Sequence, residues 1–581
     1  MAGWLTKNVN EFPIMRIASG VSVFSFLILM LAISFSIPLH LFPLPNYIEE
    51  IFVVLSVVAG SAALLWGAHE VRMSICSFAW LVLGGLFLLS ALIHPAPFVS
   101  VKLVYLVYWL VGGLALLVGE QVDWTTEGAS DYLAWVMFGC ALFGAVVGGL
   151  RHFGLLWEGL GSIVPKVVSD RMVGLIGHSN YFAYLCLVGY LSAAWLYHRA
   201  RFNGALLICC SVLLLLGLLL SGSRSVLVAW GGLVALLWLR SRVPQRYQVV
   251  VSAGFIFTLC MLPIMPGVAG WLAQFAAAGV LDGRLMAIGQ RGMDSSGRLL
   301  EWKIAFDIWR ENPWFGIGIG NYAAASFAEH LRQGVPSLPG LFTHSHNSLL
   351  QLVVELGALG LIWVSCVGAA FCFGVWRMLS CRLLPISIVF IFSVYSLFEF
   401  PLWLMHFLVL NMLLISSISG SRICIRLRLG KAFSAVLSLV FVFAFVIYVP
   451  LVERFYWSFK QYLVRAPVKI EQYDFMSAMI RDPFMEPAGY MIYFANFQMS
   501  PKTLLQEREI LERFRDSLPY PPLMARLAFI QVAMGDVDVG VKTAEDNRLF
   551  YGNGADSLLY ALRDEAKGAF PDADFSVLFR E

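Results

Sequence analysis

Residues 343–357, with the sequence THSHNSLLQLVVELG, mark the point where a polar loop meets a new apolar segment. Two imidazoles therefore stand at the mouth of a predicted membrane helix. In that helix Asn347, Gln351 and Glu355 recur at every fourth residue and share one face. Polar side chains are costly in hydrocarbon, so this face should point into the bundle or toward a water-filled cavity. The simpler alternative is that these amides only bond neighbouring helices, with His346 as the helix cap.

The composition is that of a membrane protein. Hydrophobic residues make up 59% of the 581-residue chain and charged residues only 13%, about half the share in soluble domains. The net charge of +3 is too small to indicate a nucleic-acid partner. The ten cysteines form no Cys-x-x-Cys pair and lie in or beside apolar segments, which argues against a disulfide framework or a thiolate zinc site.

Apolar runs long enough to cross a bilayer predict an all-α polytopic membrane protein with about thirteen transmembrane helices. Lys7 and Arg16 precede the first run and place the N-terminus in the cytoplasm, and the Arg-rich short turns fall on the same side. The C-terminus then lies on the periplasmic side of a bacterial inner membrane. The predicted spans lie at roughly 16–37, 48–68, 74–93, 102–119, 131–150, 180–198, 203–220, 224–240, 247–266, 347–376, 383–400, 403–420 and 431–450.

Two long polar regions divide the chain further. Residues 1–266 form a predicted N-terminal bundle, 346–450 a second bundle, and 267–345 a large periplasmic loop between them. Residues 451–581 form a predicted soluble periplasmic domain of helices. Helical periodicity over 523–535, ending in a glycine, resembles half of a tetratricopeptide-like hairpin, but one such unit does not establish a repeat array. A capping domain with no partner of its own explains the tail equally well.

The periplasmic loop contains a predicted amphipathic helix. Ser296 can cap it, an apolar surface follows from Leu299 to Trp309, and Asn312-Pro313 ends it. Such a helix would lie flat on the membrane surface or cover a cavity. Arg298 lies in its first turn, where the helix dipole disfavours a cation. Either an anionic partner or an exposed, screened charge is expected there.

The predicted topology places polar residues from distant segments on the periplasmic face. Besides the two histidines, they are Arg171, Arg224, Arg298 and Glu399. Arginine geometry matches diphosphate oxygens, and histidine is the natural proton carrier near neutral pH. Together these residues suit an anionic, lipid-linked substrate. For each residue alone a structural explanation stays open: snorkelling for Arg224, a loop charge for Arg171, and an ion pair with an arginine for Glu399.

Two further motifs do not support a cofactor. The glycine-rich segment 316–321 follows a helix rather than a strand, so it predicts a tight turn that returns the chain to the membrane and not a nucleotide fingerprint. His344-x-His346 is too closely spaced for the usual helical zinc pair, and no carboxylate lies at metal-ligand spacing. We therefore expect no metal site and no cofactor.

Several blocks of the chain resemble the O-antigen ligase and polymerase superfamily. Residues 343–360 are similar to its His-x-His-Asn…Glu-x-Gly signature, and Ser221–Arg224 and Gly297–Asn321 are similar to two other blocks. Ser396–Trp403 looks like the Glu-Tyr-Pro-Leu-Trp block of the PglL-type branch, the bacterial protein O-oligosaccharyltransferases. That branch also carries an extracytoplasmic C-terminal domain.

The resemblance implies a metal-independent membrane glycosyltransferase of the GT-C type. Its donor would be a glycan on undecaprenyl diphosphate, and its acceptor a Ser or Thr hydroxyl of an exported protein such as a pilin. His346 would orient or deprotonate the hydroxyl while Arg171, Arg224 and Arg298 hold the diphosphate, with His344 and Glu399 as secondary candidates. The implied catalytic residues are His346, His344 and Glu399, and the implied substrate-binding residues are Arg171, Asn180, Arg224, Arg298 and Asn347.

Two positions depart from the branch pattern and bear on the acceptor. Phe400 replaces the usual Tyr, and Gly177-His178-Ser179-Asn180 stands where the branch usually has Gly-Gln-Pro-Asn. Ligation of O-antigen to the lipid A core and O-antigen polymerisation use the same donor chemistry and stay open. A transporter of polyprenyl-linked glycans would instead show matching halves and charges at mid-depth, which the sequence lacks. A non-catalytic membrane receptor is a further alternative.

Overall fold

We describe the protein from a computed structural model of the 581-residue chain. Lys7 and the first part of the predicted loop 267–345 lie outside the residues that the structure describes. The described residues are 12–40, 44–156, 171–240, 242–265, 267–268, 296–337, 340–420, 422–427, 429–463, 470–552 and 554–579.

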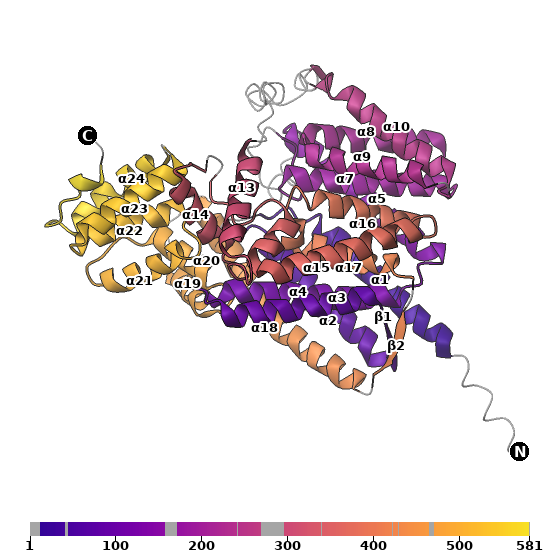
Figure 1. Cartoon of the computed structure of the whole chain (residues 1–581), viewed down its shortest axis with the longest axis horizontal. Coiled ribbons are helices and arrows are strands. Elements are labelled where there is room, and N and C mark those ends of the chain that lie inside the picture. The colour runs from indigo at the N-terminus through magenta and orange to yellow at the C-terminus, as the bar shows by residue number, and fades with distance from the viewer. Residues whose placement is uncertain are drawn as a thin grey trace, which may run out of the picture. The chain divides into compact units, whose positions relative to one another are not determined.

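The described chain is mostly helical, and a helix lies at each predicted span (Figure 1). These helices are α1 (Phe12–Ser34), α2 (Tyr47–Gly67), α3 (Ile75–Ile93), α4 (Val99–Gln121), α5 (Glu127–His152), α7 (Ser179–His198), α8 (Gly204–Ser221), α9 (Arg224–Leu239), α10 (Gln245–Met261), α15 (Ser348–Met378), α16 (Leu383–Tyr395), α17 (Met405–Ile415) and α18 (Gly430–Leu463). Among the described residues, seven helices are long and apolar enough to cross a membrane, and shorter apolar helices accompany them. The prediction of a mostly helical protein with several candidate membrane spans is confirmed, and the count of thirteen spans stays a prediction.

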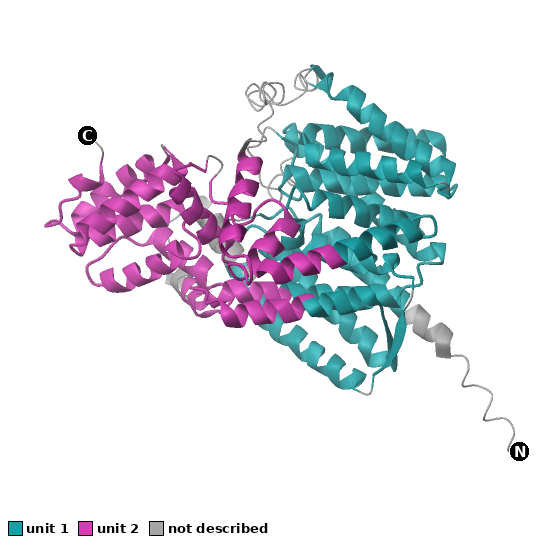
Figure 2. Cartoon of the chain, viewed as in Figure 1, with its two compact units in different colours: residues 1–82, 108–292, 367–459 teal, residues 83–107, 293–366, 460–581 magenta. Residues whose placement is uncertain are grey.

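The chain folds as two compact units, coloured separately in Figure 2. The first unit comprises residues 1–82, 108–292 and 367–459, and the second comprises residues 83–107, 293–366 and 460–581.

Helix α7 forms the core of the first unit and is buried on every side from Ser179 to Leu196. Its residues are mostly apolar all round, as expected of a helix that faces neither lipid nor water. It packs against α5, α8, α10 and α16. Gly189 permits the close approach of α5, because a Cβ there would overlap the side chain of Ala141. This packing fixes the first turn of α7, which carries Asn180.

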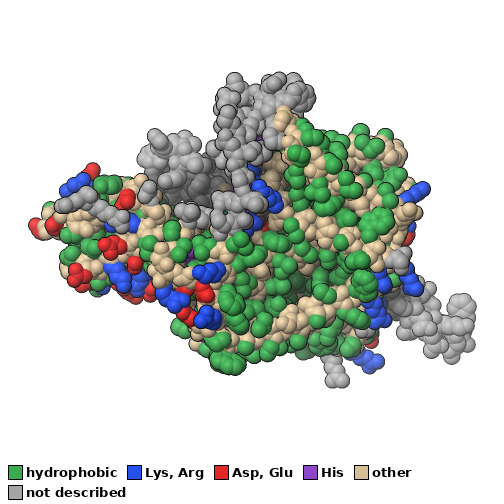
Figure 3. All heavy atoms as spheres, turned by 45° about the horizontal axis from the view of Figure 1, so that its top comes forward, with side chains coloured by type: hydrophobic (Ala, Val, Ile, Leu, Met, Phe, Trp, Pro, Cys, Tyr) green, Lys and Arg blue, Asp and Glu red, His purple; other side chains and the backbone are tan. Residues whose placement is uncertain are grey.

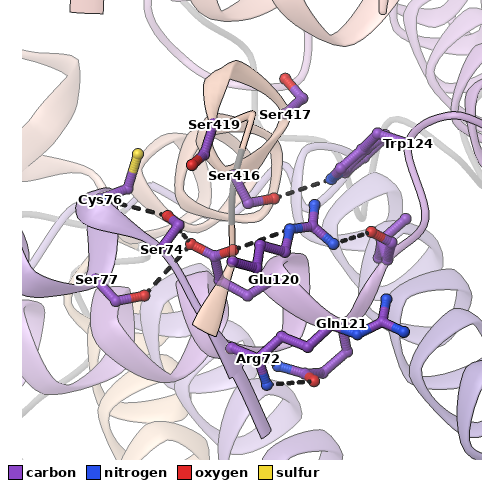
Figure 4. Close-up of polar contacts among 12 residues, drawn as sticks. Arg72, Ser74, Cys76, Ser77, Glu120, Gln121, Trp124, Ser416, Ser417 and Ser419 are labelled. Atoms are coloured by element: carbon purple, nitrogen blue, oxygen red, sulfur yellow. Dashed lines mark hydrogen bonds and ion pairs between the residues drawn. The ribbon is translucent and has the colours of Figure 1, made fainter. Parts of the chain in front are cut away.

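A two-stranded antiparallel sheet, which the sequence analysis did not predict, joins distant parts of the first unit. β1 (Glu70–Met73) pairs with β2 (Ile423–Arg426). Beside the sheet, the carboxylate of Glu120 accepts a hydrogen bond from Ser74 and pairs with Arg422 at 3.3 Å (Figure 4). A buried carboxylate needs such partners, because an unpaired charge is costly away from water. The sheet and this network hold together the ends of α3, α4 and α17.

The second unit contains α13 (Ser296–Glu311), α14 (Tyr322–Gln333), α19 (Ile470–Arg481), α20 (Glu486–Asn496), α21 (Leu504–Arg515), α22 (Pro521–Ala533), α23 (Val537–Tyr551) and α24 (Gly554–Ala569). The predicted helix near 523–535 is confirmed as α22, and Gly535 follows it with a φ of 89°. Helix α22 packs against α21, α23 and α24. Helices α19 to α24 are here called the tail helices. On the face shown in Figure 3, charged side chains crowd the surface of the tail helices, whereas hydrophobic side chains cover the helices at the predicted spans.

The connection between α3 and α4 belongs to the core of the tail helices. Phe98 is fully buried and packs on Phe514, with ring centroids 4.8 Å apart. The guanidinium of Arg513 lies 4.3 Å above the ring of Phe98 and donates to the carbonyl of Pro97 at 3.0 Å. Truncating a buried Phe to Ala typically costs about 3–5 kcal/mol. Phe98 therefore anchors the tail helices to the α3–α4 connection.

Candidate functional site

Arg171 is fixed by two hydrogen bonds within the first unit. Its Nε donates to the carbonyl of Ser221 at 2.5 Å, and its Nη2 donates to Oδ1 of Asn180 at 2.6 Å. Nδ2 of Asn180 in turn donates to Oε1 of Glu399 at 2.5 Å. Asn180 is 7% exposed and Glu399 is fully buried. A chain of charge-assisted hydrogen bonds thus runs from a half-buried guanidinium to a buried carboxylate, with Asn180 as the bridge.

The turn over residues 171–178 depends on glycine. Gly174 and Gly177 have φ values of 59° and 77°, a region that other residues rarely adopt. A Cβ on Gly174 would overlap the ring of Phe182, and one on Gly177 would overlap the ring of His40. The turn therefore packs closely on α7 and on the connection before α2, which determines where Arg171 lies.

A second glycine turn carries Arg224. Gly222 ends α8 with a φ of 64°, and Arg224 is the first residue of α9. The side chain of Arg224 is exposed. Because the carbonyl of Ser221 binds Arg171, this turn and Arg171 are adjacent.

Glu399 lies in the break between α16 and α17. Helix α16 ends at Tyr395, and the short 3-10 helix η1 (Pro401–Trp403) follows. The carbonyl of Trp403 accepts a hydrogen bond from Tyr108 at 3.0 Å, and the same hydroxyl donates to Glu50. Tyr108 and Glu50 are absent from the predicted site. In the sequence, the signal for Glu50 was its position as an acidic residue at the start of an apolar span.

His40 is a further residue that the sequence analysis missed. Its Nε2 lies 2.8 Å from the carbonyl of Leu175, and its Nδ1 lies 3.0 Å from the carboxylate of Glu49. Burial opposes the charged form, but the hydrogen bond and charge of Glu49, with nearby backbone carbonyls, raise the pKa of His40 above its usual value. A protonated His40 donates from both ring nitrogens and so connects the start of α2 to the turn that carries Arg171.

In the second unit, the histidine loop (residues 343–347) leads into α15. His346 has a φ of 52°, in the left-handed region that non-glycine residues seldom adopt. Its ring packs edge-to-face on Phe342, with centroids 5.2 Å apart. Nδ1 of His344 lies 2.8 Å from the hydroxyl of Thr343. Burial, and secondly the neighbouring imidazole of His346, lowers the pKa of His344 to about 3, so His344 is neutral at physiological pH.

Asn347, and not His346, caps α15. Its Oδ1 accepts hydrogen bonds from the backbone N–H groups of Leu349 at 3.1 Å and Leu350 at 3.0 Å. Asn is among the residues best suited to this position, because its side chain satisfies N–H groups that have no partner within the helix. This geometry corrects the alternative in which His346 is the cap, and it gives Asn347 a structural role.

The predicted polar face of α15 is confirmed. Gln351 and Glu355 are 1% and 0% exposed, and Nε2 of Gln351 donates to Oε1 of Glu355 at 2.9 Å. Oε1 of Gln351 accepts the backbone N–H of Ser345 at 2.8 Å. Oε1 of Glu355 also accepts hydrogen bonds from Tyr105 at 2.7 Å and from the N–H of Gly320 at 2.9 Å. This network ties the histidine loop to α15 and to the glycine segment.

The glycine segment 316–321 lies directly against α15. Its three glycines all have positive φ values. The N–H groups of Ile317 and Gly318 donate to the carbonyls of Val354 at 3.1 Å and Glu355 at 3.0 Å. A Cβ on the first glycine would overlap the backbone of Glu355. The predicted tight turn is confirmed, and glycine is required because backbone meets backbone.

Helix α13 is the predicted loop helix, and its buried side packs on α14 and α15. Glu301 is fully buried, accepts a hydrogen bond from Tyr322 at 2.6 Å and lies 3.1 Å from Nε2 of His330. Ile304 packs with Val354 of α15. Phe342, which contacts His346, borders the same cluster. The position of α13 and that of the histidine loop are therefore coupled through packing.

The approach to the histidine loop is also tied to the tail helices. The N–H of Ser337 donates to the carbonyl of Phe550 at 2.8 Å. Phe550 is fully buried, and its ring lies 4.8 Å from Phe327 and 5.1 Å from His330 of α14. Helix α23 thus contacts both α14 and the chain that leads to the loop.

The predicted site residues form two groups, one in each unit. The first contains Arg171, Asn180, Glu399 and the turn with Arg224. The second contains His344, His346, Asn347 and the helix that carries Arg298 in its first turn. Within the described ranges, no three His, Cys, Asp or Glu side chains gather as possible metal ligands.

Two family models match the chain. The model described as O-antigen ligase matches residues 209–365, a range that includes Arg224, Arg298 and the histidine loop. The model described as virulence factor membrane-bound polymerase, C-terminal, matches residues 383–559, a range that includes Glu399. No curated protein matches the chain. The two matches support the O-antigen ligase and polymerase superfamily, and with it a membrane enzyme of glycosyl transfer.

Proposed function

We propose that the protein transfers a glycan from undecaprenyl diphosphate to Ser or Thr hydroxyls of exported proteins, for example pilin. The observation that carries this proposal is the hydrogen-bonded chain Arg171–Asn180–Glu399. It fixes a guanidinium beside the turn of Arg224, and two arginines in one place suit the oxygens of a diphosphate. Fixed donors of this kind stabilise charge that develops in a transition state without first having to reorganise.

The chemistry follows from the charges. The acceptor hydroxyl attacks the anomeric carbon, the bond between that carbon and the diphosphate oxygen breaks, and the configuration inverts. The hydroxyl proton passes to the imidazole of His346, while the electron pair leaves with the lipid diphosphate. The family resemblance assigns the offset of the resulting negative charge to Arg171, Arg224 and Arg298.

We propose supporting roles for the two secondary candidates, His344 and Glu399. The low pKa of His344 keeps its ring neutral, so it suits a hydrogen bond to substrate and not proton transfer near neutral pH. Glu399 is buried and bonded to Asn180, which suits a group that positions Arg171 from behind. Asn347 caps α15 and holds the loop in place.

The choice of a protein as the acceptor rests on the similarity of Ser396–Trp403 to the oligosaccharyltransferase branch and on the helical tail that follows the last span. The two family matches favour a second candidate, ligation of O-antigen to the lipid A core or its polymerisation. Both candidates use one donor and one set of arginines, so they differ only in the acceptor hydroxyl.

The proposed location is the bacterial inner membrane. Lys7 and Arg16 before the first span and the Arg-rich short turns place the N-terminus in the cytoplasm. With thirteen spans, the histidine loop and the tail helices are periplasmic, where lipid-linked glycans and exported proteins meet.

The test compares exported proteins and lipopolysaccharide from cells that carry His346→Asn, His346→Ala or the wild type. Asn tolerates the left-handed backbone at this position, so His346→Asn removes the base while keeping the loop. His69→Asn, at an exposed histidine, is the matched control. Intact-mass spectrometry should show a glycan-sized mass on an exported protein in the wild type and control only. Altered lipopolysaccharide with unchanged protein masses would transfer the assignment to a ligase or polymerase, and normal glycosylation in both variants would refute the role of His346.

A further inference from the structure

We infer that one face of α13 binds the acidic phospholipid surface of the membrane. Leu299, Lys303, Phe306 and Arg310 are all exposed and recur at intervals of three and four residues. That spacing aligns them in one stripe along the helix, here called the α13 stripe. Leu299 is 57% exposed and Phe306 is 49% exposed, so the stripe alternates large apolar and basic side chains.

The acidic residues of α13 lie off this stripe and are engaged elsewhere. Glu301 is fully buried. Asp307 accepts a hydrogen bond from Gln333 of α14 at 2.9 Å, and Glu311 pairs with Arg332 of α14 at 2.8 Å. The charged side chains of the stripe itself, Lys303 and Arg310, are both basic. A helix with apolar side chains and Lys or Arg on the same exposed side fits a membrane interface rich in anionic lipid.

The segment that follows α13 is exposed and lies against two candidate spans. Trp314 and Phe315, which follow α13, are 73% and 54% exposed. Trp is enriched at the level of the lipid headgroups. The N–H of Ala358 in α15 donates to the carbonyl of Pro313 at 2.7 Å. Phe315 also borders an apolar hollow of the candidate spans α3 and α15, together with Leu86, Leu89, Ile93, Leu356 and Leu359.

Lipid binding by the stripe would act on the histidine loop. The opposite side of α13 packs with Val354 of α15 and, through Phe342, with the ring of His346. Acidic headgroups that hold the outer side of α13 therefore fix the helix and the loop at the membrane surface. This inference concerns bulk phospholipid and does not depend on the identity of the glycan donor or acceptor.

The experiment uses the full chain in nanodiscs that contain no polyprenyl lipid. p-Benzoylphenylalanine replaces Phe306, and after irradiation intact-mass spectrometry counts lipid adducts in discs of phosphatidylcholine alone and in discs mixed with phosphatidylglycerol. The matched control site is Tyr560 of α24, an aromatic residue that is 55% exposed. Lys303→Gln with Arg310→Gln tests the charge, and Lys542→Gln with Lys567→Gln, at two exposed lysines of the tail helices, is its control.

We expect lipid adducts at position 306 and essentially none at position 560. In mixed discs the ratio of phosphatidylglycerol adducts to phosphatidylcholine adducts should exceed the ratio of the two lipids in the disc, on the order of tenfold. The double substitution in the stripe should abolish the enrichment and the control pair should retain it. Adducts at position 306 that join protein to protein, a yield no higher than at position 560, or no preference for the acidic lipid would overturn the inference.

Discussion

Replacing Asn180 with Leu should strongly slow glycan transfer and should also destabilise the protein. Asn180 makes two hydrogen bonds to charged groups, at 2.6 Å to Arg171 and at 2.5 Å to Glu399. Leu has a similar size and can fill the same buried space, so the main change is the loss of both bonds. Arg171 then keeps its bond to the carbonyl of Ser221 but loses the contact that fixes its Nη2.

The magnitude follows from these two bonds. A hydrogen bond to a charged group contributes about 1.5–3 kcal/mol. The two bonds share one amide and the surroundings relax, so we take about 2–4 kcal/mol for their combined loss. Each 1.4 kcal/mol corresponds to about a tenfold change, so the rate constant of transfer should fall about 30- to 700-fold. The carboxylate of Glu399, left without this donor, should also lower the free energy of unfolding by about 1–3 kcal/mol.

The assay is single-turnover transfer by the purified enzyme with a lipid-linked donor, together with a thermal unfolding curve. Asn411→Leu is the matched control, because Asn411 of α17 is 2% exposed and donates to the backbone carbonyl of Phe407 at 2.9 Å. Both variants should unfold at a lower temperature, but only Asn180→Leu should lose transfer. A wild-type rate in Asn180→Leu, or an equal loss in both variants, would refute the role given to the bridge.

Three further predictions follow from the same structure. His344→Gln should leave the pH dependence of transfer between pH 5 and 8 unchanged, because a pKa of about 3 places the titration of His344 below this range; a pH step that disappears in the variant contradicts this. Gly357→Ala should lower the free energy of unfolding by about 1–3 kcal/mol, because Gly357 has a φ of 64° and a Cβ there would meet the backbone of Trp314. Gly368→Ala, where no atom lies within 4 Å, is the control in the same melting experiment. His40→Ala should lower the free energy of unfolding more at pH 6 than at pH 9. Because the folded-state pKa of His40 is raised, its stabilising contribution is fully present below the unfolded pKa of about 6.5 and is lost as the pH rises through the folded pKa. Equal shifts of the melting temperature at the two pH values would contradict the last prediction.

Sequence periodicity predicts the features that a single segment determines, such as which side chains share one face of its helix. The polar face of α15 and the helix α22 follow from spacing alone, because residues four apart on a helix must share a face. The partners of that face depend on how distant segments meet. Tyr105 donates to Glu355 across 250 positions of the chain, and no local pattern encodes this pairing. The sheet of β1 and β2 was missed because its two strands are far apart in the chain. Each strand is also too short to show a two-residue period of its own.

The two histidines of the loop show where local sequence is insufficient for chemistry. His344 and His346 are two residues apart, and their spacing alone does not show which of them can carry a proton. The backbone separates them: Asn347 takes the cap, His346 adopts a left-handed conformation, and His344 lies where burial lowers its pKa to about 3. A base must accept a proton near the working pH, so a pKa of about 3 argues against His344 as the base. Environment, and not residue type, therefore sets the pKa of a histidine in this motif, and such environments form only after distant segments have packed.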